Sequence, residues 1–147
     1  MTMLDNSHYI EKLRSSGLRP TKQRIKICEV LFNSEKTFHF TINELVKRIS
    51  KSTNDKISLA TVYNTVHAFK SKGYLKEIPI NSDQSYFDTN TSHHHHFYDE
   101  TQKDLIDIDD ADVEPVKINT RIPGKKIKSV EVLLKSKTTN LNSISTL

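Results

Sequence analysis

Four consecutive histidines, His93–His96, follow Asp88 by a few residues and are the part of this sequence best suited to ligand chemistry. Imidazole nitrogens and carboxylate oxygens bind Fe, Zn and Mn, and an imidazole also serves as an axial ligand of haem iron. A lone histidine is usually a solvated polar side chain. Four in a row beside a carboxylate favour a metal or haem site.

An extended backbone through this run would send successive side chains to opposite faces. His93 and His95 would then lie on one face and His94 and His96 on the other, so that the run would serve two sites. His39, directly before a predicted helix, is a further candidate ligand from the N-terminal half.

The elements that must position these residues begin with a series of amphipathic helices. The first ends near Gly17, and the second starts after Thr21. Thr41 and Glu44 have the spacing of a capping box for the third, and Ser58 is a suitable N-cap for the fourth, which Gly73 closes. The predicted buried positions of the fourth helix are Leu59, Val62, Val66 and Phe69. Two helices joined by the polar turn 53–55 predict a helix-turn-helix.

Strand-like segments follow the fourth helix. Two of them, residues 74–80 and 84–88, flank a polar turn and predict a hairpin, which would form a wing. FYDE, LIDID and SVEVLLK are further predicted strands. We therefore expect an α+β protein, with a winged helix-turn-helix domain over residues 1–88. A small α/β dimerisation domain over residues 89–147 would end in a frayed tail.

The outward face of the fourth helix has the composition of a DNA reader. Short hydrogen-bonding groups and rings contact base edges in the major groove, whereas cations hold phosphates. Residues 1–80 carry 14 Lys and Arg against 7 Asp and Glu, while residues 81–147 carry 8 against 11. A basic first half suits a polyanion. The candidate DNA-binding residues are Thr61, Tyr63, Asn64, Lys70 and, ahead of the second helix, Arg19. Thr65 is also predicted to lie on the outward face of this helix.

Composition also limits the classes of protein to which this chain can belong. We find no apolar segment long enough for a membrane span and no signal peptide, which predicts a cytoplasmic protein. The single cysteine, Cys28, falls at an apolar helical position and is interpreted as a buried hydrophobic residue. No nucleophile motif accompanies the histidines, so we do not expect an enzyme.

Four motifs together resemble the ferric uptake regulator family over roughly residues 10–135. They are GLRPTKQRIKICEVL, HFTINEL, ISLATVYNTVHAFKSKGYL and YFDTNTSHHHHFY. The resemblance implies a dimeric, metal-responsive regulator in which Tyr63 and Asn64 read bases and Arg19 approaches the minor groove. It also implies a hinge metal site of His39, Asp88 and His95, and a second site containing His94 and His96.

Several departures from the family pattern are informative. Phe97 stands where many members carry a histidine, and Val130 stands near another expected histidine. Both cysteine pairs of the family's structural zinc site are missing, so no four-cysteine zinc is expected. The chain is most similar to the iron response regulator branch of the family. That finer resemblance implies haem binding at His94, His95 and His96, although its Cys-Pro haem motif is missing because Glu29 follows Cys28.

The predicted function is an iron-responsive, haem-modulated transcription regulator of iron homeostasis genes. It would bind AT-containing inverted repeats in double-stranded DNA as a homodimer or higher oligomer. A regulator co-repressed by Fe, Mn or Zn ions is the main alternative. A metal-handling protein is a remote one.

Overall fold

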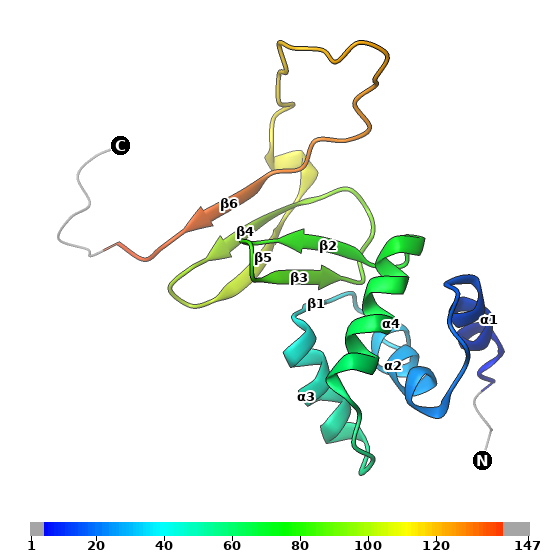
Figure 1. Ribbon diagram of the computed structural model, residues 1–147. Helices are drawn as coiled ribbons and strands as arrows, with labels where there is room; N and C mark the ends of the chain where they lie inside the picture. The colour runs from blue at the N-terminus through cyan, green and yellow to red at the C-terminus, as the bar shows by residue number, and fades with distance from the viewer. Residues whose placement is uncertain (1–4, 140–147) are drawn as a thin grey trace. The chain divides into compact units, whose positions relative to one another are not determined.

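A computed structural model describes residues 5–139 and separates the chain into two compact units, residues 1–91 and 92–147 (Figure 1). Each unit has its own secondary structure and is described by itself. That these units correspond to a DNA-binding domain over residues 1–88 and a dimerisation domain over residues 89–147 stays a prediction.

Four helices make up most of the first unit: α1 (Ser7–Ser15), α2 (Lys22–Phe32), α3 (Ile42–Ser52) and α4 (Leu59–Lys72). The predicted start of α2 after Thr21 and the predicted caps of α3 and α4 are confirmed. Thr21 and Ser58 accept hydrogen bonds from the first turns of α2 and α4, and Thr41 and Glu44 form a reciprocal capping box on α3. Gly73 ends α4 with a left-handed φ of 90°, a conformation that costs a residue with a Cβ more than it costs glycine.

The hydrophobic core of the first unit lies between these helices. Apolar side chains at helical spacing are removed from water there, and such burial is the main stabilising term of a small unit. Leu59 departs from the prediction, since it is 54% exposed at the first position of α4. The fully buried helical residues include Leu13, Ile27, Leu45, Ile49, Val62, Val66 and Phe69.

A three-stranded sheet completes this unit, in the order β1-β3-β2. The predicted hairpin is confirmed as β2 (Lys76–Pro79) and β3 (Ser85–Asp88), which pair antiparallel. The third strand, β1 (His39–Phe40), was not predicted, because two residues are too few to show an alternating pattern. Helices α3 and α4 followed by this hairpin form a winged helix-turn-helix.

The second unit contains another three-stranded sheet, in the order β5-β4-β6. β4 (His95–Asp99) pairs antiparallel with β5 (Asp104–Ile108) and parallel with β6 (Leu133–Ser136). The FYDE and LIDID strands are thus confirmed, whereas the SVEVLLK strand begins only at Leu133. A 3-10 turn, Asp110–Asp112, is the only helical element among the described residues of this unit, so the α/β composition expected for it is not found there.

The α+β fold class is confirmed, with the helices concentrated in the first unit. Residues 140–147 of the predicted frayed tail lie outside the described residues. Among the residues that the structure describes, no helix is both long and apolar enough to cross a bilayer.

Candidate metal centre and DNA-reading helix

Helix α4 presents the predicted base readers on its solvent face. Its start is fixed by Ser58, whose Oγ accepts the Thr61 amide at 3.1 Å. Tyr63 is 52% exposed, and Asn64 is exposed beside it, while Thr61 is half-buried. The side chains of Tyr63 and Asn64 are therefore accessible to a binding partner that contacts α4.

Thr65, by contrast, was wrongly placed on the outward face. It is fully buried, and its hydroxyl donates to the Thr61 carbonyl at 2.7 Å. Positions 62, 65, 66 and 69 have the i, i+3, i+4, i+7 spacing of one helical stripe, which places Thr65 inside the core face.

Arg19 and Lys70, the two basic residues among the candidate DNA contacts, differ in their surroundings. Arg19 is exposed, and its carbonyl accepts a hydrogen bond from Arg24 Nη1 at 2.7 Å. Lys70 is paired instead, since its Nζ lies 3.1 Å from Glu77 Oε2 on β2. Such a surface ion pair contributes little stability, so Lys70 could exchange Glu77 for a phosphate at small cost.

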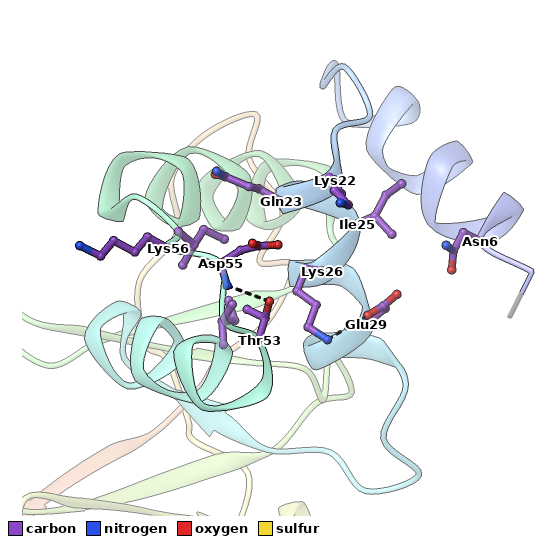
Figure 2. A pocket seen from close by; sticks show the side chains of 11 residues that line it. Asn6, Lys22, Gln23, Ile25, Lys26, Glu29, Thr53, Asp55 and Lys56 are labelled. Atoms are coloured by element: carbon purple, nitrogen blue, oxygen red, sulfur yellow. Dashed lines mark hydrogen bonds and ion pairs between the residues drawn. The ribbon is translucent and has the colours of Figure 1, made fainter. Parts of the chain in front are cut away.

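A pocket of about 750 Å³ lies beside the turn between α3 and α4, as Figure 2 shows. Lys22, Lys26 and Lys56 contribute cations to it, and Lys26 pairs with Glu29 at 3.4 Å. The pocket contains none of the candidate metal ligands or base readers, so it plays no part in the site developed below.

His39 and Asp88 lie opposite each other in the first unit, as register partners of β1 and β3. Asp88 is buried, and its Oδ1 accepts the Asn90 amide at 2.8 Å. That these two residues share a metal ion with the histidine run stays a prediction.

The predicted alternation of the histidine run is confirmed in the second unit. His94 and His96 have ring centroids 4.5 Å apart and both approach Asp107, whereas His93 and His95 approach Asp110. Two histidine–aspartate groups therefore occupy the two sides of the run, and the ligand atoms of each lie within 4.8 Å of one another.

The hydrogen bond of His94 determines which of its nitrogens carries the proton. His94 Nδ1 lies 2.7 Å from the Ser92 carbonyl, which can only accept, so Nδ1 is protonated. In the neutral ring Nε2 then carries a lone pair, and it lies 3.4 Å from Asp107 Oδ1. His96 Nε2 approaches the same oxygen at 3.2 Å. A metal ion at this position would be within reach of the His94 Nε2 lone pair and the Asp107 carboxylate.

The His95 ring has the opposite protonation. The Val132 amide donates to His95 Nδ1 at 2.9 Å, which leaves the proton on Nε2, 3.0 Å from Asp110 Oδ1. A metal ion at Nε2 would have to displace that proton and leave an anionic ring. His95 is thus satisfied by protein groups that join β4 to the segment before β6.

His93 makes a second contact with the segment before β6. Its Nε2 donates to the Val130 carbonyl at 2.9 Å, and Nδ1 lies 3.2 Å from Asp110 Oδ1. His95 distinguishes the two groups, because its Nε2 proton already points at Asp110, so the group containing His94, His96 and Asp107 is the better candidate ligand set. Its imidazole and carboxylate atoms suit Fe²⁺, Mn²⁺ and Zn²⁺, so these residues fit a transition metal ion.

Asp107 and Asp110 were missed in the sequence. Their signal was present in LIDIDD, because an antiparallel hairpin between this segment and the histidine strand pairs His96 with Asp107. The resemblance placed His95 with His39 and Asp88. In the second unit, however, His95 is grouped with His93 and Asp110.

These observations define a class of protein: a winged helix-turn-helix chain with histidine–carboxylate groups in a second, β-rich unit. The model of the ferric uptake regulator family matches residues 15–136. The chain therefore belongs to the ferric uptake regulator family, whose members are transcription regulators rather than enzymes.

Individual relatives agree with this assignment. The peroxide-responsive repressor PerR of Staphylococcus saprophyticus is 36% identical over 98 residues, which are 67% of this chain and 64% of the repressor. The match thus spans less than two thirds of that protein.

Solved structures share the fold. The ferric uptake regulator of Vibrio cholerae has a TM-score of 0.66 at 23% identity, with 88% of this chain and 98% of that chain covered. The Pseudomonas aeruginosa regulator, solved with manganese, has a TM-score of 0.63 at 22% identity, covering 94% and 100%.

Proposed function

We propose that this protein is a metal-responsive, sequence-specific DNA-binding transcription regulator that acts as a homodimer. Family membership supports the regulatory class, and the exposed Tyr63 and Asn64 on a capped α4 support base reading. A single recognition helix covers only a few base pairs, so a symmetric dimer on an inverted repeat supplies the remaining contacts.

The metal part of the proposal rests on one observation. The unprotonated Nε2 of His94 and the Nε2 of His96 both face Asp107 Oδ1, at 3.4 and 3.2 Å. Bound there, a metal ion would neutralise the carboxylate and take the His94 Nε2 lone pair, with His96 Nε2 as a further ligand atom. His39 and Asp88 stay predicted ligands from the first unit.

Metal uptake by purified variants tests this assignment. We expect Asp107→Asn to lower the affinity for Mn²⁺ or Zn²⁺ by at least about 10-fold, because an amide oxygen carries no charge to offset the ion. Asp109→Asn, an exposed neighbour, is the matched control and should bind like the parent. Equal metal affinity in all three proteins would rule out Asp107 as a ligand.

Iron is the ion that the resemblance implies, and manganese is the ion present with the P. aeruginosa relative. A histidine–carboxylate set accepts either, so the donor types do not choose between them. Titration of Fe²⁺, Mn²⁺ and Zn²⁺ in one DNA-binding assay ranks the three. Footprinting on promoters of iron-uptake genes then tests the predicted iron-homeostasis role.

Haem modulation is the finer function implied by the iron response regulator resemblance. It rests on His94, His95 and His96, whose exposed fractions are only 7%, 3% and 4%. An axial haem ligand needs an imidazole that a porphyrin face can reach, so this burial favours an ion. If equimolar haem weakens DNA binding, haem and not a metal ion is the ligand of these histidines. If haem has no effect on DNA binding, the result supports a metal ion.

A further inference from the structure

Four rings form a continuous row in the first unit, from its sheet to the solvent face of α4. Phe40 on β1 stacks on Phe87 on β3 with centroids 6.0 Å apart, and the rings of His67 and Phe87 are nearly perpendicular with centroids 5.4 Å apart. His67 in turn lies 4.1 Å from Tyr63. The two phenylalanines are buried, His67 is half-buried and Tyr63 is exposed. The row thus connects a rigid core to a candidate base reader.

Helix geometry explains the outer contact. Tyr63 and His67 are one helical turn apart, and helical side chains lean towards the N-terminus, so the His67 ring lies under that of Tyr63. Phe87, only 2% exposed, fixes the other side of His67. Within the described part of the chain, Tyr63 and His67 have no hydrogen bond or ion pair, so ring packing alone restrains Tyr63.

We propose that His67 is a positioning residue that holds the Tyr63 ring in the orientation needed for base contact. This inference rests on the proposed DNA-reading function. An exposed tyrosine without such support samples several rotamers, and their loss on binding reduces affinity by roughly 2- to 10-fold. The effect belongs to specific binding only, because non-specific binding depends on phosphate contacts.

The test begins with a duplex selected by the parent protein from a random library in the presence of Mn²⁺ and Zn²⁺. Dissociation constants are then measured on that duplex and on a scrambled duplex of the same composition. The variants are His67→Ala, His67→Phe, Tyr63→Ala and the His67→Ala/Tyr63→Ala double variant. Ser71→Ala, exposed on α4 and outside the ring row, is the matched control. Thermal unfolding verifies that each variant is folded.

We expect His67→Ala to weaken binding to the selected duplex about 2- to 10-fold and to leave scrambled binding unchanged. His67→Phe should restore affinity, since it keeps a ring between Phe87 and Tyr63. In the Tyr63→Ala background, His67→Ala should have no further effect.

Three results would overturn the inference: no loss in His67→Ala, no rescue by His67→Phe, or an equal loss without Tyr63. The last two would make His67 a direct polar contact with DNA. A parent protein that selects no preferred duplex would instead contradict the proposed function, which separates the two failures.

Discussion

The protonation of each histidine ring decides what it can bind. A ring whose Nδ1 donates to a carbonyl presents an unprotonated Nε2 to a metal ion, and backbone partners of this kind commonly orient metal-binding histidines. His94 has this arrangement through Ser92, whereas His95 has the reverse one through the Val132 amide. We therefore expect these adjacent histidines to have different roles, with His94 as a metal ligand and His95 as a structural residue.

Alanine substitutions should separate these roles. We expect His94→Ala to abolish high-affinity metal uptake, because it removes the nitrogen lone pair facing Asp107. His95→Ala should retain metal uptake but lower the free energy of unfolding by about 1–3 kcal/mol, since the Val132 amide loses its acceptor. Equilibrium dialysis and chemical denaturation measure the two effects. A greater loss of metal uptake in His95→Ala than in His94→Ala would contradict these assigned roles.

The thiol of Cys28 should be unreactive towards alkylating reagents in the folded protein. Burial raises the pKa of its thiol from 9.0 to about 12, and only the thiolate reacts with iodoacetamide. At pH 9 we expect slow labelling of the native chain and rapid labelling in denaturant. Because the unfolded thiol ionises first, Cys28 also contributes a loss of stability as the pH rises from about 9 to about 12. Fast native labelling at pH 9 would show that the thiol is accessible.

At the scale of elements, helix α3 depends on its capping box. The Thr41 hydroxyl accepts the Glu44 amide at 3.2 Å, and Glu44 Oε2 accepts the Thr41 amide at 3.0 Å. We expect Thr41→Ala to lower the free energy of unfolding by about 0.5–2 kcal/mol. Ser50→Ala, at an exposed interior position of α3, is the control and should have little effect. Equal stability of both variants in urea would mean that the cap is dispensable.

The elements with strong local signals were the ones that the sequence predicted. The start of α2 after Thr21, the caps at Thr41 and Ser58, and the 81–83 turn each depend on residues close in the chain, and all are present. Strand β1 and the late start of β6 depend instead on pairing with distant strands, which local patterns do not report.

The same reasoning applies to the candidate site. The histidines and their alternation are local features, and both were predicted. Asp107 and Asp110 become partners only through the β4–β5 hairpin, and the His95 tautomer depends on Val132, 37 residues away. Contacts of this kind require the fold.

On the scale of the whole molecule, charge is divided along the chain. Residues 1–80 have a net charge of +7 and residues 81–147 a net charge of −3. A basic first half should make DNA affinity fall steeply with salt as phosphate counterions are released. We expect a linear loss of log affinity with log salt on selected and scrambled duplexes alike, measured by fluorescence anisotropy. A salt-independent affinity would contradict phosphate binding by this half.

The most direct test of a metal-responsive DNA regulator measures how DNA affinity depends on both metal and DNA sequence. The affinity of the full chain is measured for a selected inverted repeat and for its scrambled counterpart, each with Mn²⁺ and with chelator. We predict that metal tightens binding to the selected duplex by about 5- to 150-fold, the range of typical allosteric coupling, and leaves the scrambled duplex nearly unaffected. Equal affinities for both duplexes, or a selected-duplex affinity that metal does not change, would contradict a metal-responsive DNA regulator.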